Sequence, residues 1–330
     1  MKKLAIAIPT YNEFNYLKVG LSSLIEQVDV YKNEVDLYVF DNNSNDKTGI
    51  EVPKLFNKRK NCHYIKNSKN IGLYLNQLKS LQIDNYQYNM VVGSDDVILP
   101  ESISIILKYL DKEDCSIFFT NYYAFSNNYM EPKQFFAEEK DKSFSRPYDM
   151  LNYPSVGHFS GFIFRSIYTK KYLDILLMEH DTSFYEQHRG IIGFLAAYIC
   201  SKENKKTFFI GKRCLATKAY KKVNYNHLTH CCSENLNNHY NFFKKDISNY
   251  DDYLYRKNLI RQDILKSSIR NLPFMTRHEN YETYQDLRFH YKDEVYFNMI
   301  IAPIFYINRI NLLREFFVYL INFYIKRKKV

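Results

Sequence analysis

The sequence predicts an α/β fold in which a mostly parallel central sheet is flanked by helices, with a helical extension at the C-terminal end. Short apolar runs of strand length alternate with segments whose apolar residues recur at helical spacing. Four such runs in the first 100 residues each end in a polar cluster. The 330 residues are enough for one large domain over 1–218, in halves 1–110 and 111–218, and a smaller helical region over 219–330.

The first strand–helix unit opens the chain. An apolar run at 4–8 ends at Pro9-Thr10-Tyr11-Asn12, and apolar residues then recur at helical spacing over 14–28. Two lysines precede this run, as in a signal peptide, but the run stops after about five residues, which is shorter than the apolar region of such a peptide. We therefore expect a first β-strand here.

Two further units follow the same pattern. The apolar run 35–40 ends in the polar cluster DNNSNDKT at 41–48, and the helix after it is weakly marked because Pro53 interrupts it. A short third strand at 64–65 leads through a polar segment into a helical pattern over 73–81. These elements predict strands and helices in regular alternation.

The fourth apolar run, Met90 to Val92, breaks at Gly93 and delivers two adjacent carboxylates, Asp95 and Asp96. Neighbouring carboxylates repel each other, so a cation, hydrogen-bond donors or water must offset their charge. A divalent ion that bridges to a phosphate is one solution. The alternative is a solvated turn that caps the helix predicted over 101–110.

The four polar clusters are expected to share one edge of the sheet, because ligands of parallel α/β sheets bind outside the carboxyl ends of the strands. Neither the P-loop pattern nor the first-turn glycine pattern of dinucleotide-binding folds occurs in the chain. A metal at this edge would therefore have to carry the charge of a bound phosphate.

Four motifs carry a resemblance: IPTYNE at 8–13, DNNSNDKT at 41–48, NIGLYLN at 70–76 and VGSDD at 92–96. In this order and spacing they resemble the family 2 glycosyltransferases of the GT-A fold, over about the first 110 residues. The resemblance implies a nucleotide-sugar donor and Mn²⁺ or Mg²⁺, with Asp96 as the metal ligand. Gly93 stands where the family often has a further acid. The donor contacts that it implies are Pro9, Thr10, Tyr11, Asn12, Asp41, Asn43, Asn70 and Asp95.

A catalytic base is needed because sugar hydroxyls are poor nucleophiles until their proton is being removed. The resemblance places this acid at the start of a helix well after the metal motif. Glu186, which precedes the apolar helix predicted over 191–200, fits that position, and Asp181 is the alternative. Glu186 could equally complement the positive end of that helix. A catalytic Glu186 implies a single displacement with inversion at the anomeric carbon.

The rest of the second half is predicted in outline. Residues 115–125 are apolar and aromatic, as in a core strand, and 127–146 are read as a loop or small hairpin. A turn at His158 leads to a strand over 162–165 and a helix over 168–177. His158 is a candidate contact to the acceptor, and the alternative is a histidine satisfied by nearby backbone.

The net charge and the cysteines limit the binding partners and the cellular compartment that are compatible with the sequence. The net charge of +10 suits nucleic acid, anionic lipid or a phosphorylated substrate, but no motif groups the basic residues with stacking aromatics, which disfavours nucleic acid. Six scattered cysteines lack the spacing of a disulfide framework and indicate a reducing cytosol. The histidines and cysteines between 227 and 239 match no paired-ligand pattern for zinc.

The tail from Val295 is rich in large apolar residues and ends in Lys326-Arg327-Lys328-Lys329. Polar and charged residues interrupt it, so a membrane-spanning helix is disfavoured and a helix on the cytoplasmic face of the membrane is favoured. The alternative is packing against the catalytic domain or a second copy in a homo-oligomer.

Together these features predict a cytoplasmic, peripherally membrane-bound, inverting glycosyltransferase of the hexosyltransferase type. It would transfer a sugar from a nucleotide-sugar donor to a glycan or lipid-linked acceptor in cell-surface polysaccharide synthesis. The alternative is a noncatalytic module of the same fold that binds a nucleotide sugar or anionic lipid. A nucleotidyltransferase is disfavoured, since the first strand is not followed by a basic glycine-rich loop.

Overall fold

The computed structural model describes residues 1–150, 153, 156, 158–179 and 191–218. The chain divides into two compact units, Met1–Lys221 and Lys222–Val330, and the described residues all belong to the first. The predicted helical region over 219–330, its membrane-facing tail and the cysteine–histidine segment at 227–239 lie outside the described residues. The predicted division into domains stays a prediction.

The described residues form a mixed sheet with the strand order β3-β2-β1-β4-β9-β6-β10-β5. Strands β1 to β4 are parallel neighbours, whereas β9 is antiparallel to both β4 and β6. Because β10 is parallel to β6, the strands β6 and β10 run in the same direction as β1 to β4. The predicted α/β fold with a mostly parallel sheet flanked by helices is confirmed.

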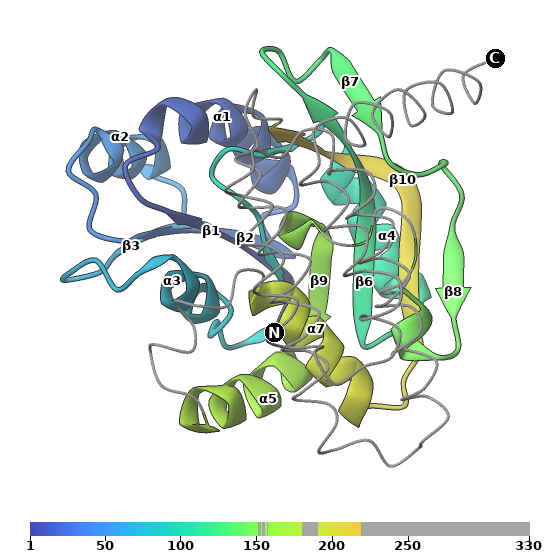
Figure 1. The fold of residues 1–330 in the computed structure, drawn as a ribbon. Coiled ribbons are helices and arrows are strands. Elements are labelled where there is room, and N and C mark those ends of the chain that lie inside the picture. Colours follow the sequence, from blue (N-terminus) through green and yellow to red (C-terminus); the bar gives the residue numbers. More distant parts are fainter. Residues whose placement is uncertain (151–152, 154–155, 157, 180–190, 219–330) are drawn as a thin grey trace, which may run out of the picture. The chain divides into compact units, whose positions relative to one another are not determined.

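The first half follows the predicted order of elements. In Figure 1, α1 and α2 lie on one side of the parallel strands, and α3 and α5 lie on the other. The apolar residues of α1 that recur at helical spacing are buried from Leu17 to Val28. The bounds are β1 Lys2–Thr10, α1 Phe14–Val30, β2 Val35–Asp41, α2 Thr48–Phe56, β3 Cys62–Lys66, α3 Leu73–Ser80 and β4 Tyr86–Val91.

The second half completes the sheet. The predicted core strand, turn, strand and helices are all present, and the two unpredicted strands β5 and β10 pair with each other. The bounds are β5 Val97–Ile98, α4 Ser102–Lys112, β6 Ile117–Phe125, β7 Pro132–Phe135, β8 Lys142–Phe144, η1 Pro147–Met150, η2 Phe159–Gly161, β9 Phe162–Arg165, α5 Ser166–Glu179, α7 Ile191–Lys202 and β10 Thr207–Lys218.

The segment 127–146 differs from the predicted loop or small hairpin. It contributes two short strands that do not pair with each other, because β7 pairs with the end of β6 and β8 pairs with the start of β10. Both strands are largely exposed and polar, so their sequence lacks the alternation that would have marked them.

The core of the second half is built from phenylalanine. Phe118, Phe119, Phe162, Phe164 and Phe209 are all fully buried, and the rings of Phe119 and Phe162 meet edge to face at 4.8 Å. Such ring pairs bury a large area, and they join β9 to β6 without any tryptophan. Among the described residues, no helix combines the length and apolarity needed to cross a membrane.

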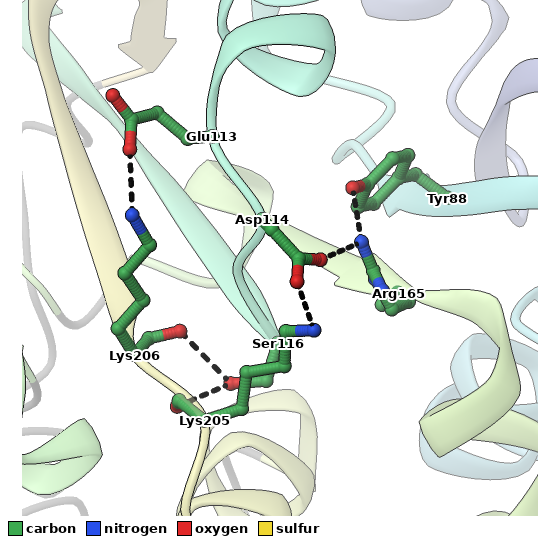
Figure 2. A network of polar contacts seen from close by, with 7 residues as sticks. All are labelled: Tyr88, Glu113, Asp114, Ser116, Arg165, Lys205 and Lys206. Atoms are coloured by element: carbon green, nitrogen blue, oxygen red, sulfur yellow. Dashed lines mark hydrogen bonds and ion pairs between the residues drawn. The ribbon is translucent and has the colours of Figure 1, made fainter.

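A polar network joins the residues just before β6 and β10 to Arg165 at the end of β9 (Figure 2). By the direction of these strands, this edge of the sheet is opposite the one that carries the polar clusters. The carboxylate of Asp114 accepts hydrogen bonds from both Arg165 and Lys205. Nearby, the hydroxyl of Ser116 donates to the backbone carbonyl of Lys205 at 3.1 Å. The hydrogen bond from Lys205 has the largest effect on the pKa of Asp114. Together with the positive charge of Arg165, it outweighs the effect of burial, so the pKa of Asp114 is lowered.

Replacing Asp114 by asparagine is expected to lower the free energy of unfolding at pH 7 by about 1 kcal/mol or less, because exposed ion pairs contribute little. The Asp114 side chain is 65% exposed. Since its folded-state pKa is lowered, its contribution is present above the unfolded pKa and disappears as the pH falls through the folded pKa. Urea unfolding of both proteins should therefore converge well below the ordinary aspartate pKa of about 3.9. A loss at pH 7 as large as that of a buried pair would contradict this reading.

Candidate functional site

The polar strand ends meet at one edge of the sheet, as predicted. Thr10 lies opposite Asp41 in the register of β1 and β2, and Asp41 lies opposite Lys66 in that of β2 and β3. The Val92 amide, just before the acidic pair, donates to the Ala7 carbonyl at 2.9 Å. The clusters after β1, β2, β3 and β4 are therefore neighbours in space.

The loop after β1 is joined to the loop after β2. Pro9 and Thr10 are buried at the end of β1, whereas Tyr11 is exposed. Asn12 has a φ of 57°, a left-handed conformation that asparagine tolerates. Its amide donates to Ser44 Oγ at 2.9 Å, and its side-chain oxygen accepts from the Asn45 amide at 2.8 Å. These bonds hold Asn12, the last of the four residues 9–12 that are predicted to contact the nucleotide.

Asp41 is completely buried, so it presents no surface to solvent. One of its oxygens accepts from the Ser44 amide at 2.8 Å, and the other accepts from the hydroxyl of Tyr64. Burial and this hydrogen bond raise the pKa of Tyr64 above its ordinary value. A Cβ added to Gly49 would lie 3.3 Å from the Tyr64 hydroxyl and 3.9 Å from Asp41 Oδ2. The predicted contact of Asp41 with a ribose or base stays a prediction.

A cluster of asparagines arranges the loop before α3. Asn42 donates to Asn70 Oδ1 at 2.8 Å and accepts from the Ile71 amide at 2.9 Å. The side chain of Asn67 links Asn42 to Asn76, at 3.1 and 2.9 Å. Asn70 thus lies beside the β2 end, as predicted, and Asn42 holds it there.

Asn43 is half-buried with a φ of 67°. It stands between the tightly bound Asn42 and Ser44, in a conformation that asparagine adopts more readily than most residues. Its predicted contact with the donor stays a prediction.

The acidic tip after β4 is packed around Gly93. A Cβ on Gly93 would lie 2.9 Å from Asp95 Oδ1, 3.0 Å from Asp96 Oδ2 and 3.0 Å from the Phe159 ring. Both carboxylates therefore converge on the bare face of this glycine, which explains its place in the motif. Ser94 is also buried and donates to the carboxylate of Glu13, at the start of α1.

Asp96 is bound by residues far along the chain. Its side chain is 1% exposed, and its Oδ2 lies 2.6 Å from His158 Nε2 and 2.5 Å from Ser160 Oγ. Its Oδ1 accepts from the Lys218 amide at 3.2 Å. Burial and then the negative charge of Asp96 raise the pKa of nearby Tyr122 to about 12. Asp95, by contrast, is only partly buried.

His158 pairs through Nε2 with the carboxylate of Asp96, at 2.6 Å. Its predicted contact with the acceptor stays a prediction. Burial alone would lower the pKa of His158, but the carboxylates of Asp96 and Asp95 outweigh burial and raise it. The sequence did not predict this pair, and its only signal was a histidine in the turn before the predicted strand 162–165. Asp181 and Glu186 lie outside the described residues, so the predicted base stays a prediction.

The carboxylate pair fits a divalent cation. No group of three or more metal-binding side chains occurs among the residues that the structure describes. Mg²⁺ is commonly held by one or two carboxylates together with substrate phosphates and water, so such a group is not required. The neighbouring carboxylates of Asp95 and Asp96 at the end of β4 supply this type of donor set. Asp96 would be held for that role by its three hydrogen-bond partners.

Replacing Gly93 by alanine is expected to destabilise the fold by about 1–3 kcal/mol, as overpacking does, and to weaken the metal-dependent nucleotide binding that the sequence predicts. The new methyl group would push against Asp96, whose carboxylate is already held by two side chains. Urea unfolding and titration calorimetry would measure the two effects.

The matched control is Gly193→Ala in α7, where an added Cβ meets nothing within 4 Å. This control should keep its nucleotide binding and should lose no stability, because alanine is favoured over glycine within a helix. Wild-type binding in the Gly93→Ala variant would contradict the packing described at the acidic tip.

A pocket of about 820 Å³ lies at the opposite edge of the sheet. Its lining includes Tyr86 at the start of β4 and Arg165 at the end of the antiparallel β9. None of the predicted site residues lines it. Its volume therefore does not identify it as the site, and the polar strand ends remain the candidate.

Comparison with known proteins places the sequence motifs in context. A family model described as glycosyl transferase family 2 matches residues 5–172. The chain is 32% identical over 112 residues to abequosyltransferase RfbV of Salmonella typhimurium, covering 33% of each chain. It is 28% identical over 138 residues to the glycosyltransferase MJ1057 of Methanocaldococcus jannaschii, covering 41% of this chain and 47% of that one. The matched part thus spans between a third and a half of these relatives.

Solved structures share the fold at low sequence identity. TarS 1-349 of S. aureus in complex with UDP-GlcNAc superimposes with a TM-score of 0.67 and 14% identity, covering 94% of this chain and 88% of that one. The mannosyltransferase PcManGT from Pyrobaculum calidifontis in complex with GDP-Man and Mn²⁺ gives a TM-score of 0.55 and 12% identity, covering 93% and 85%. These likenesses establish the fold alone.

Proposed function

The chain belongs to glycosyl transferase family 2, and we propose that it transfers a sugar from a nucleoside-diphosphate donor to a glycan or lipid-linked acceptor in cell-surface polysaccharide synthesis. The observation that carries this proposal is the convergence of Thr10, Asp41 and the Asp95–Asp96 pair at one edge of the sheet. The nucleotide sugars in the two structural neighbours support a donor of this class.

The donor would lie across the strand ends in a fixed direction. Its nucleoside would lie over the ends of β1 and β2, where Tyr11 is exposed and Asp41 is buried at the last residue of β2. Its diphosphate would lie near Asp95 and Asp96, at the end of β4. Two hydrogen bonds, from Asn12 to Ser44 and from Asn42 to Asn70, would hold the loops around the nucleoside in one geometry.

Mn²⁺ or Mg²⁺ is the proposed cofactor, and Asp96 is its proposed protein ligand. Asp95 would contact either the ribose or a group that is itself bound to the metal. When bound, such an ion stabilises the negative charge that develops on a departing diphosphate. The residues of this chain hold the carboxylates against their mutual repulsion, and His158 supplies a compensating donor beside them. The manganese ion in the PcManGT complex supports this assignment.

The transfer itself is proposed to invert the anomeric carbon in one displacement. Glu186, or alternatively Asp181, would take the proton of the attacking acceptor hydroxyl. The support is sequence position alone, because both acids precede the apolar helix α7, Ile191–Lys202. The product would then carry the configuration opposite to that of the donor sugar.

The enzyme is proposed to work in the cytoplasm, peripherally on the inner face of the membrane. Cys62, Cys115 and Cys214 are buried thiols outside any disulfide, which agrees with a reducing compartment. The apolar tail from Val295 and its terminal basic run would provide the contact with anionic lipid.

The deciding experiment is titration calorimetry of the full chain with UDP-, GDP-, CDP- and dTDP-sugars, with and without manganese. Selective, manganese-dependent binding of one donor is expected. Incubation with that donor should then release the nucleoside diphosphate when a suitable acceptor is added. Donor binding without turnover on any acceptor would favour the noncatalytic binding module, and no binding under any condition would contradict the proposal.

A further inference from the structure

One short turn from the second half of the domain contacts the acidic tip at three points. The turn is η2 with its preceding residue His158, and it leads directly into β9. His158 contacts Asp96, the ring of Phe159 packs over Gly93, and Ser160 bonds to both residues. No other described segment makes side-chain hydrogen bonds to Asp96.

Ser160 joins the backbone of the tip to its carboxylate. The residue is completely buried, and its hydroxyl donates to Asp96 Oδ2 at 2.5 Å while accepting from the Gly93 amide at 2.9 Å. A hydroxyl that donates in one direction and accepts in the other is fixed in orientation. The Asp96 carboxylate is therefore held relative to the backbone three residues before it.

The two carboxylate oxygens of Asp96 differ in how many further hydrogen bonds or ligands they can accept. Oδ2 is bound by both His158 and Ser160, whereas Oδ1 has a single described partner, the Lys218 amide at 3.2 Å. A carboxylate oxygen accepts two hydrogen bonds or ligands. With respect to the described residues, Oδ1 thus keeps acceptor capacity, and Oδ2 does not.

We propose that Ser160 and His158 are positioning residues that hold Asp96 Oδ2, so that Oδ1 is presented to the divalent cation of the donor complex. This inference rests on the proposed function, because it assumes that Asp96 binds the metal. Neither residue needs to touch the donor or the reacting atoms. The turn would thereby tie the metal-binding carboxylate to β9, the strand that joins the two halves of the sheet.

The test is the affinity of the full chain for Mn²⁺, measured by electron paramagnetic resonance of free manganese, alone and with each of UDP, GDP, CDP and dTDP. Ser160→Ala is expected to weaken manganese binding by about 10- to 100-fold, which is the usual effect of losing a residue that orients a metal ligand. The nucleotide affinity without metal should not change.

The matched control is Ser116→Ala. Ser116 is as fully buried as Ser160, and its hydroxyl bonds to backbone carbonyls in the network at the opposite edge (Figure 2). It should show a loss of thermal stability similar to that of Ser160→Ala with wild-type manganese affinity. Equal manganese affinities in the two variants would overturn the proposal.

A second pair of variants separates positioning from ligation at His158. His158→Gln keeps a hydrogen-bond donor and should retain most of the manganese affinity, whereas His158→Ala should lose about tenfold. Equal, large losses in both variants would overturn the positioning role. His63→Ala is the control, because His63 also lies near a carboxylate, 3.8 Å from Asp36, at a site distant from the tip.

The outcomes distinguish this inference from the function on which it rests. A wild-type chain that binds no manganese with any nucleotide would refute metal assistance, and with it the inference. Wild-type manganese binding that survives both Ser160→Ala and His158→Ala would refute the inference alone. A selective loss in the two variants of the turn would support both.

Discussion

Asp96→Asn is expected to reduce the transfer rate by a factor of at least about 10² to 10³, the usual effect of removing one group that stabilises transition-state charge. It should also abolish the gain in donor affinity that manganese provides. The replacement removes the negative charge of a side chain that is 1% exposed and already bound by His158 and Ser160. An asparagine there carries no negative charge to attract the cation. If its oxygen accepts from His158 and Ser160, its NH2 group faces the Lys218 amide, which is also a donor.

Two measurements check this result: initial rates at saturating donor, and calorimetric donor binding with and without manganese. Asp114→Asn is the matched control, because it makes the same chemical change in the exposed network at the opposite edge of the sheet (Figure 2). That variant should keep the wild-type rate. If manganese still increases the donor affinity of the Asp96→Asn variant, the metal ligand is Asp95 rather than Asp96.

Glu186→Gln is expected to lower the transfer rate by about 10² to 10⁴, the range for loss of a general base, while leaving donor binding unchanged. A carboxamide of the same shape cannot take the proton of the acceptor hydroxyl. It also adds no charge near the diphosphate, so the donor should bind as before. Single-turnover rates with the donor identified by calorimetry would separate the chemical step from binding.

Asp181→Asn tests the alternative base in parallel. If Glu186→Gln keeps full turnover and Asp181→Asn does not, the base is Asp181. If Glu186 only complements the positive end of the helix, its replacement should lower thermal stability by a small amount and leave the rate intact. Nuclear magnetic resonance of the product would show whether the anomeric configuration is inverted, and retention would contradict the single displacement.

The first half of the fold was predictable because its signals are local. Each strand is a short apolar run, each helix repeats its apolar residues at helical spacing, and the turns between them are rich in asparagine and aspartate. The strands β7 and β8 were not predictable in the same way. Their residues are exposed, and their partners are β6 and β10 rather than each other. Their pairing depends on edges of the sheet that exist only after the chain has folded.

In the candidate site, too, some features follow from local sequence and others depend on the folded structure. Its residue types and their order along the chain, from Pro9 to Asp96, were legible because polar residues follow each apolar run and parallel strands bring their ends together. The burial of Asp41 beneath Tyr64 was not legible, since a residue on one strand gives no sign of which side chain on the next strand will reach it.

By itself the sequence determined the α/β fold, the order of elements in the first half and the acidic tip that ends β4. Only the tertiary structure decided how that tip is held. The partners of Asp96 lie 62, 64 and 122 residues further along the chain, at His158, Ser160 and Lys218. The strand order β4-β9-β6-β10 brings them together. That order follows from the packing of the whole core, because local periodicity selects an element but does not select its neighbour.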